Sequence, residues 1–255
     1  VGSSSIYSMH PSVEPLDDGG FVITGTFETS GADVYAMIFD GSGNLVSQPS
    51  NMYFPAHTSS NGANFGITDL ANEVADSGSG NMLTASSFGN GKFIVVAEVS
   101  GDVDNLSNTQ AVRGRDIVAQ IFENDGTPIG SAFEIHPDGA GNNWNLEYHQ
   151  SNPSVAELKD GGFVVAWNEA REQTNGQGAW VKRFDEMGNP VGSAQKVSSD
   201  VLNGSYDNNQ TKVDVAALED GGYVVTWRDV SEYVAPFYQS NLYGHRFDSN
   251  GQSVV

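Results

Sequence analysis

The stretches SVAELKDGGFVVAWNE (154–169) and DVAALEDGGYVVTWRD (214–229) decide the fold, because both repeat one pattern of strand, glycine turn and apolar strand. SVEPLDDGGFVITGTF (12–27) is a third copy, and LTASSFGNGKFIVVAEV (83–99) is a diverged fourth. Runs such as FVVAW and YVVTW are nearly all apolar, which is typical of strands in sheets packed on both faces. Four copies of one short unit indicate a repeat architecture.

Each copy is followed by a second hairpin whose first strand ends in Phe. The four versions are DVYAMIFDGSGNLV (33–46), DIVAQIFENDGTPI (116–129), AWVKRFDEMGNPV (179–191) and LYGHRFDSNGQSV (242–254). Two hairpins give four short strands per unit, which is what a propeller blade requires. We therefore predict an all-β protein, a β-propeller of four blades with four antiparallel strands each. A β-sandwich is the alternative, and regular four-strand units disfavour it.

We expect the whole chain, 1–255, to form this single propeller domain. The predicted blades are about 11–50, 82–135, 153–198, and 212–255 plus 1–8, with an insertion at 51–81. VGSS (1–4) resembles VGSA (191–194), which begins an outer strand, and the C-terminus stops where such a strand should start. The N-terminal strand is therefore predicted to close the last blade and leave no sheet edge exposed. The alternative is a piece cut from a longer array.

Charge and composition exclude some classes of protein. The net charge is −21 with 11 Lys and Arg residues, so the surface repels nucleic acid and anionic membranes. There is no cysteine, which favours a bacterial over a eukaryotic secreted protein. No apolar run is long enough for membrane insertion, and no signal peptide is found. We expect a mature or excised chain, or one exported without an N-terminal signal.

The sequence resembles repeats of very large secreted bacterial proteins, including RTX-type, calcium-associated adhesins exported by type I secretion. The residues that carry the resemblance are DGGFVVAW (160–167), GNPVGS (188–193) and YGHRFD (243–248), and the similarity extends over nearly the whole chain. It implies an extracellular or cell-surface module for adhesion or binding. The nonapeptide GGxGxDxUx of RTX calcium rolls is absent, so the resemblance assigns no calcium ligand to any residue.

The Asp-Gly motifs are interpreted as turns rather than cation loops. Gly161 supplies the positive φ that a tight hairpin needs, and Asp160 bonds to the turn backbone. Asp102 and Asp104 are better calcium candidates, because they alternate within a longer, variable loop. Calcium takes about six to eight oxygen ligands, and the EF-hand Gly and terminal Glu are missing here. A solvated acidic loop is therefore the alternative.

The long connecting segments all map to one end of the predicted blades, opposite the tight glycine turns. They are 51–81, 100–115, 136–152, 168–178, 198–211 and 228–241. The residues predicted to bind a ligand there are Trp144, Tyr148, His149, Tyr233, Phe237 and Tyr238. Aromatic faces beside amides and carboxylates suit sugar rings or peptide side chains. The alternative is that these rings only pin the long segments onto the propeller.

No catalytic residue is assigned from the sequence. The five histidines lack metal-ligand spacing, and there is neither a cysteine nor a GxSxG motif to supply a nucleophile. Several groups could serve acid–base chemistry: Glu147, Tyr148, His149, Glu169, Glu172, Asp229 and Glu232. Because carboxylates are plentiful, a chance pair carries little weight.

Three functions follow from these observations. The first is a non-enzymatic binding or adhesion module of a secreted bacterial protein, which recognises a glycan, a peptide or a neighbouring subunit. The second is a polysaccharide-degrading enzyme, a lyase or glycosidase, on a propeller scaffold. The third is a structural unit that self-assembles or forms part of a larger extracellular polypeptide.

Overall fold

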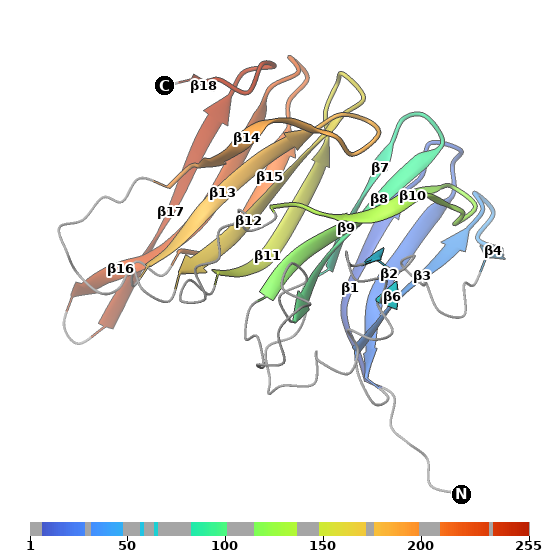
Figure 1. Cartoon of the computed structure of the whole chain (residues 1–255), viewed down its shortest axis with the longest axis horizontal. Helices are drawn as coiled ribbons and strands as arrows, with labels where there is room; N and C mark the ends of the chain where they lie inside the picture. Colours follow the sequence, from blue (N-terminus) through green and yellow to red (C-terminus); the bar gives the residue numbers. More distant parts are fainter. Residues whose placement is uncertain are drawn as a thin grey trace, which may run out of the picture. The chain divides into compact units, whose positions relative to one another are not determined.

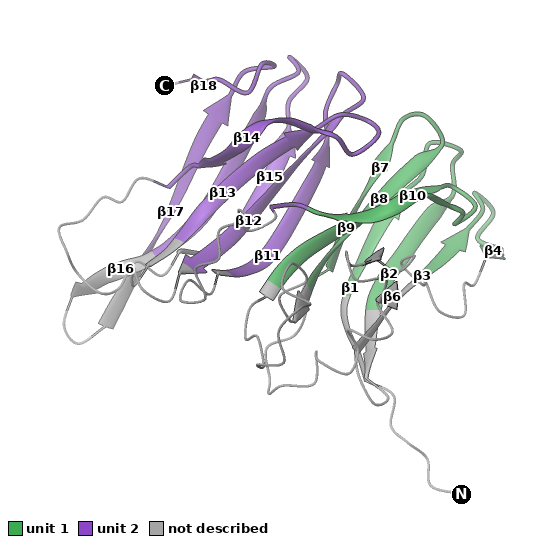
Figure 2. Cartoon of the chain, viewed as in Figure 1, with its two compact units in different colours: residues 1–134 green, residues 135–255 purple. Residues whose placement is uncertain are grey.

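A computed structural model describes ten parts of the chain. They are residues 7–28, 32–47, 57–58, 64–65, 83–100, 115–136, 148–171, 176–198, 210–234 and 237–254. The described strands fall into two compact units, residues 1–134 and 135–255 (Figure 2). Within the described residues, no helix is long and apolar enough to cross a membrane.

The first unit contains two four-stranded antiparallel sheets (Figure 1). The first sheet is formed by β1 (Tyr7–Pro15), β2 (Phe21–Glu28), β3 (Ala32–Phe39) and β4 (Leu45–Ser47). The second is formed by β7 (Leu83–Phe88), β8 (Lys92–Ser100), β9 (Arg115–Glu123) and β10 (Pro128–Glu134). Between them in the chain, β5 (His57–Thr58) and β6 (Asn64–Phe65) form a short ladder.

The second unit repeats this arrangement. Its first sheet is formed by β11 (Tyr148–Glu157), β12 (Phe163–Arg171), β13 (Gly176–Phe184) and β14 (Pro190–Lys196). Its second sheet is formed by β15 (Gln210–Ala217), β16 (Tyr223–Val234), β17 (Phe237–Phe247) and β18 (Ser253–Val254). In both sheets each strand pairs with the next one along the chain.

The prediction of an all-β protein with four blades of a β-propeller is confirmed, because each of these four sheets is a blade. We refer to them as blades 1 to 4 in chain order. The strand expected to close blade 4 starts at Val1, and residues 1–6 lie outside the described residues. Closure by the N-terminal strand and the single-domain range 1–255 therefore stay predictions.

The Phe that ends the third strand of each blade occupies one repeated position. It stacks on the aromatic residue that begins the second strand, with ring centroids 4.7–5.3 Å apart. The pairs are Phe21–Phe39, Phe93–Phe122, Phe163–Phe184 and Tyr223–Phe247. Burying one such ring contributes about 1.5–3 kcal/mol, so each pair is a main stabilising element of its blade.

Apolar side chains also join the two blades inside each unit. In the first unit, Val22 and Ile38 of blade 1 belong to one buried cluster with Val95 of blade 2. In the second unit, Val164 and Val181 of blade 3 share a cluster with residues of blade 4. Sheets with both faces covered explain why the strand sequences are almost continuously apolar.

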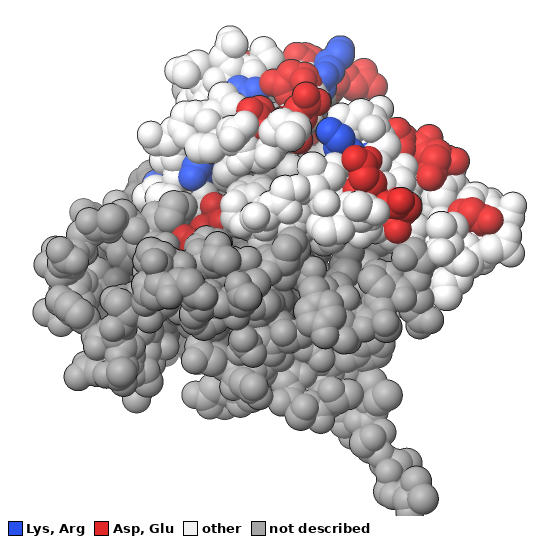
Figure 3. All heavy atoms as spheres, turned by 45° about the vertical axis from the view of Figure 1, so that its right-hand side comes forward, with Lys and Arg blue, Asp and Glu red and all other residues white. Residues whose placement is uncertain are grey.

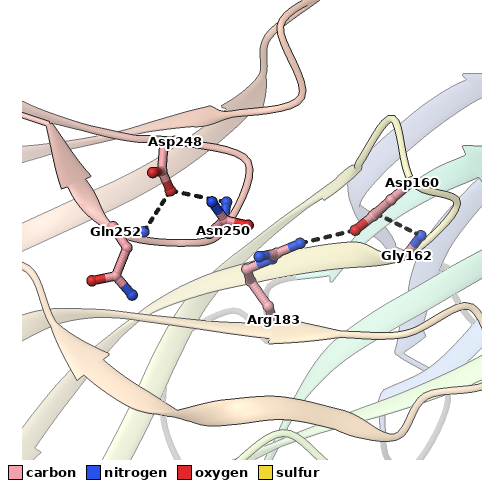
Figure 4. Close-up of polar contacts among 6 residues, drawn as sticks. All are labelled: Asp160, Gly162, Arg183, Asp248, Asn250 and Gln252. Carbon is pink, nitrogen blue, oxygen red and sulfur yellow. Dashed lines mark hydrogen bonds and ion pairs between the residues drawn. The ribbon is translucent and has the colours of Figure 1, made fainter.

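The interpretation of the Asp-Gly motifs as turns is confirmed. In the β11–β12 turn, Gly161 has a φ of 86°, and the Gly162 N–H donates to Asp160 Oδ1 at 3.1 Å. Arg183 Nη2 donates to Asp160 Oδ2 at 2.9 Å (Figure 4). A Cβ on Gly162 would lie 2.4 Å from the Phe184 carbonyl oxygen, so only glycine fits there.

The second hairpin of each blade has a different turn, in which an aspartate also accepts hydrogen bonds from the turn backbone. Asp248 Oδ1 accepts hydrogen bonds from the backbone N–H groups of Asn250 and Gln252, at 2.9 and 2.8 Å (Figure 4). In the corresponding turn of blade 1, hydrogen bonds from the side chain and backbone of Asn44 lower the pKa of Asp40. These carboxylates are therefore used by their own turns.

The described surface reflects the acidic composition. Asp and Glu side chains outnumber Lys and Arg side chains on the face seen in Figure 3. Such a surface repels anions in general.

Candidate functional site

One face of blade 3 carries two rows of aromatic and polar side chains. The first row crosses three strands, because Trp167 on β12 pairs with Trp180 on β13, which pairs with Lys196 on β14. In the second row, Gln150 on β11 pairs with Glu169 on β12, and Glu169 pairs with Gly178 on β13. Both rows share a face, because residues two apart on a strand point the same way.

His136 lies against this face and joins the two rows. Its ring centroid is 5.7 Å from that of Trp167 and 5.9 Å from that of Trp180, on which it stacks. Its Nε2 atom is 3.9 Å from Glu169 Oε2. His136 follows β10 in the chain, and its side chain is thereby brought against β12 and β13. We call His136, Trp167, Glu169, Trp180 and Lys196 the His136 cluster.

Two hydrogen bonds hold the backbone that carries His136. Gln150 Nε2 donates to the His136 carbonyl oxygen at 2.8 Å, and Lys182 Nζ donates to the Ile135 carbonyl oxygen at 2.8 Å. Ile135 is fully buried, and burial lowers the pKa of Lys182. The imidazole is therefore presented from a fixed backbone, which is what a preorganised site requires.

Burial differs sharply between the two ionisable groups of the pair. The Glu169 side chain has no exposed surface, whereas 28% of the His136 side chain is exposed. Trp167 Nε1 lies 3.5 Å from Glu169 Oε2, at the long limit of a hydrogen bond. A buried carboxylate is costly unless charged or polar partners surround it. Glu169 thus lies within ion-pair distance of the His136 ring, and His136 is the more exposed member of the pair.

Most of the residues predicted to bind a ligand are not among those whose side chains the structure describes. Trp144 lies outside the described residues. Tyr148, Tyr233, Phe237 and Tyr238 are placed in strands by their backbone alone. In blade 4, Tyr233 pairs with Tyr238 and Val234 with Phe237.

The predictions that 168–178 and 228–241 form long loops are wrong. β12 extends to Arg171 and β13 begins at Gly176, so the described part of 168–178 is paired strand. β16 extends to Val234 and β17 begins at Phe237, so most of 228–241 is a hairpin. Aromatic and β-branched residues favour extended, paired strands, and this preference outweighs the turn-rich composition of the segment.

His149 is the one predicted residue whose side chain is described, and it is not part of the His136 cluster. It pairs with Ala170 and is partly buried. Its neighbour Gln150 shares a face with Glu169, so His149 points to the opposite face of the sheet. The structure therefore does not bring His149 together with His136 or Glu169.

The calcium candidates Asp102 and Asp104 lie outside the described residues. In the part of the chain that the structure describes, no group of three His, Cys, Asp or Glu side chains is arranged to hold a metal ion. Calcium binding therefore stays a prediction.

Sequence reasoning missed the His136 cluster. His136 attracted attention only for its lack of metal-ligand spacing, and Glu169 was one of many carboxylates. A usable signal was present: Glu169 follows Trp167 at a spacing of two in a predicted strand, so both must share a face. The contribution of His136 could not be read in this way, because it lies outside the repeat.

Comparisons with known proteins agree with the fold and go no further. No family model matches the chain, and no curated protein matches it. A PL25 ulvan lyase, a polysaccharide lyase, matches with a TM-score of 0.57 at 11% identity, over 97% of this chain and 55% of its own. A glycosyl hydrolase from Bacteroides ovatus matches with a TM-score of 0.51 at 12% identity, over 97% of this chain and 70% of its own.

A protein of unknown function from Dyadobacter fermentans is also similar, with a TM-score of 0.53 at 13% identity, over 96% of this chain and 61% of its own. This chain spans little more than half of the ulvan lyase. At such low identity the likenesses show a shared fold.

Proposed function

We propose that this chain acts on a polysaccharide, and that the sugar chain is bound and cleaved at the His136 cluster. The observation that carries the proposal is the partly exposed His136 imidazole, 3.9 Å from the fully buried Glu169 carboxylate. The solved structures of similar fold support it, since they include a polysaccharide lyase and a glycosyl hydrolase. In each of those proteins the name describes action on a carbohydrate.

The geometry suits acid–base chemistry. A carboxylate beside an imidazole fixes the orientation of the ring and stabilises the imidazolium that forms when the ring accepts a proton. His136 would accept a proton from the sugar, and Glu169 would act as a positioning residue. The backbone hydrogen bonds from Gln150 and Lys182 hold the imidazole in place during the reaction.

The aromatic row supplies a surface for the sugar. Trp180 is partly exposed, and its ring stacks with that of His136 at an interplanar angle of 25°. Flat apolar rings next to a few fixed polar groups are typical of carbohydrate sites. Trp167 is fully buried and supports this surface from below.

A second candidate function is recognition of a glycan without cleavage, as an adhesion module of a secreted bacterial protein. The exposed ring surface of Trp180 and His136 favours it, because such a surface serves binding whether or not a bond is broken. A peptide, a neighbouring subunit or self-assembly are the other partners that the acidic repeat sequence predicts.

Turnover and binding on one set of polysaccharides separate the two candidates. The wild type, His136→Gln and the matched control His245→Gln are incubated with acidic and neutral polysaccharides. Product release is followed by size-exclusion chromatography, and binding by affinity electrophoresis. His245 lies on β17 and contacts Ser253 and Phe247, so its substitution should leave function intact. Cleavage that only His136→Gln loses supports the enzyme, and binding alone supports the second candidate. If the wild type neither binds nor cleaves any of the polysaccharides, both candidate functions are overturned.

A further inference from the structure

We infer that the polysaccharide is acidic and that Lys196 binds a uronate carboxylate beside His136, so that the chain is cleaved by β-elimination. This inference rests on the proposed function and names its substrate class. It starts from a glycine that no turn requires. Gly178 is buried in the middle of the sheet, directly opposite Glu169, and its φ lies outside the left-handed region.

The missing side chain of Gly178 leaves room for Lys196. A Cβ at this position would lie 2.7 Å from Lys196 Cε and 3.0 Å from Trp180 Nε1. The aliphatic part of Lys196 therefore crosses Gly178 along the edge of the Trp180 indole. Because Gly178 pairs with Glu169 and Trp180 pairs with Lys196, the lysine extends from one row of the cluster toward the other.

Lys196 is exposed, and its Cε atom lies over Gly178, next to the indole edge of Trp180, with which His136 stacks. It is thus placed to meet a charged group of a sugar that covers Trp180.

Because of its charge distribution, blade 3 repels an anion less than the rest of the chain does. Five of the 11 Lys and Arg residues and six of the 32 Asp and Glu residues fall within 153–198. This blade is therefore nearly neutral in a chain of net charge −21. A polyanion is repelled less here than elsewhere on the protein, and salt further screens the repulsion from the other blades.

The side chains of the cluster fit elimination better than hydrolysis. Hydrolysis of a glycosidic bond normally uses two carboxyl groups, one on each side of the bond. The described side chains of the cluster include one carboxylate, Glu169, and it is buried against the imidazole. Proton abstraction from carbon next to a carboxylate needs one base and a cation that stabilises the negative charge developing on that carboxylate.

The reaction balances with the groups present. Neutral His136 takes the proton from C5 of the uronate, and the electron pair of that C–H bond forms the C4–C5 double bond. The C4–O bond breaks, and the departing oxygen takes a proton back from the His136 imidazolium. The products are a shortened chain and a chain ending in an unsaturated uronate, and the protein returns to its starting state.

Kinetics on ulvan, alginate and polygalacturonate, each compared with its carboxyl-reduced form, test the inference. The unsaturated product is followed by its ultraviolet absorbance for the wild type, Lys196→Gln and Lys196→Arg. We expect the wild type to cleave at least one acidic polymer and not its reduced form. Lys196→Gln should raise KM roughly fivefold, the upper range for an exposed ion pair, and should also lower kcat, because the lysine stabilises the charge that develops on the carboxylate. Lys196→Arg should restore most of both losses.

The outcomes separate this inference from the proposed function. If the protein cleaves reduced or neutral polymers and His136→Gln loses this cleavage, the inference of an acidic substrate is overturned. The proposed function is then retained. An unchanged KM in Lys196→Gln overturns the role of Lys196. No cleavage and no binding of any polymer overturns the proposed function together with this inference. Circular dichroism of each variant verifies that the fold is retained.

Discussion

The Nε2 atom of His136 lies 3.9 Å from Oε2 of Glu169, a carboxylate without exposed surface. The two residues come from different parts of the chain, one after β10 and one near the end of β12. In the proposed function, His136 is the proton acceptor and Glu169 positions it. Several measurements follow from this arrangement and from the blades around it.

Replacing Glu169 by Gln should slow the reaction without weakening substrate binding. Gln keeps the size of the side chain and removes the charge that stabilises the imidazolium, while general acid–base catalysis as a whole contributes about 10²–10⁴-fold. We expect kcat to fall by about tenfold or more with KM little changed. Glu186→Gln, in the exposed β13–β14 turn, is the control and should behave as wild type. Equal kcat values for Glu169→Gln and wild type would contradict the role of the pair.

Replacing Gly178 by Ala should act through Lys196. The added methyl group overlaps with Lys196 Cε at 2.7 Å, so the flexible lysine must move off the Trp180 edge. We expect KM for the acidic polymer to rise as it does in Lys196→Gln. The double variant should be no worse than Lys196→Gln alone, because the two changes share one mechanism.

Gly244→Ala is the control for that substitution. Gly244 lies in another blade, on β17, where an added Cβ would meet Thr226 Cγ2 at an ordinary 3.4 Å. Its KM should stay at the wild-type value. Additive losses in the double variant, measured by the same kinetics, would show that Gly178 does not act through Lys196.

Replacing Phe163 by Ala should destabilise blade 3 strongly. Phe163 is fully buried and stacks on Phe184 at a centroid distance of 5.0 Å. Truncating a buried Phe costs about 3–5 kcal/mol in free energy of unfolding. Met187→Ala, at a side chain that is 55% exposed, should change it by less than about 0.5 kcal/mol. Urea unfolding measures both, and a loss below about 1 kcal/mol for Phe163→Ala would contradict the packing described.

Tyr223 should make the protein sensitive to alkali. Burial raises the pKa of Tyr223 to about 12. The folded state therefore favours the neutral phenol, and its contribution to stability is complete below about pH 10, the pKa of an unfolded Tyr. As the pH rises from about 10 to about 12, up to about 2 kcal/mol of the free energy of unfolding should be lost.

Tyr223→Phe should remove that part of the alkaline loss. The Oη atom of Tyr223 has no hydrogen-bond partner among the described residues, so its removal should leave stability near neutral pH equal or slightly higher. Tyr243→Phe, at a half-exposed ring, should keep the wild-type pH dependence. Denaturant unfolding at about pH 8 and about pH 11 measures both variants. A Tyr223→Phe variant as alkali-sensitive as wild type would refute the assignment.

Calcium binding at Asp102 and Asp104 is tested by thermal melting. If these carboxylates bind calcium, the melting temperature rises with added calcium and falls after chelation, because a ligand that binds the folded state stabilises it. The double variant Asp102→Asn/Asp104→Asn should then lose the response. A wild-type melting temperature that is indifferent to calcium and chelator would eliminate the site.

The repeat alone was enough to predict the blades. Alternating and continuous apolar patterns identify strands, and glycines such as Gly161 mark turns because few other residues adopt a positive φ. These patterns depend only on residues close together in the chain, so the sequence alone displays them. Strand lengths were predicted less well, since the aromatic residues of 228–241 extend β16 and β17.

The candidate site could not be predicted in the same way. The His136 cluster depends on register: Trp180 faces Trp167 on one side and Lys196 on the other. It also depends on a residue outside the repeat, His136, lying across the sheet. Neither relation leaves a periodic trace in the chain. The spacing of Trp167 and Glu169 is the one part of the cluster that the sequence displays.

The central claim is tested most directly by a crystal structure of His136→Gln with a bound oligouronate, because we expect this variant to bind the substrate without cleaving it. We predict a sugar ring in contact with Trp180 and its carboxylate within hydrogen-bond distance of Lys196 Nζ. An oligouronate bound elsewhere on the chain, with the blade 3 face empty, would contradict it.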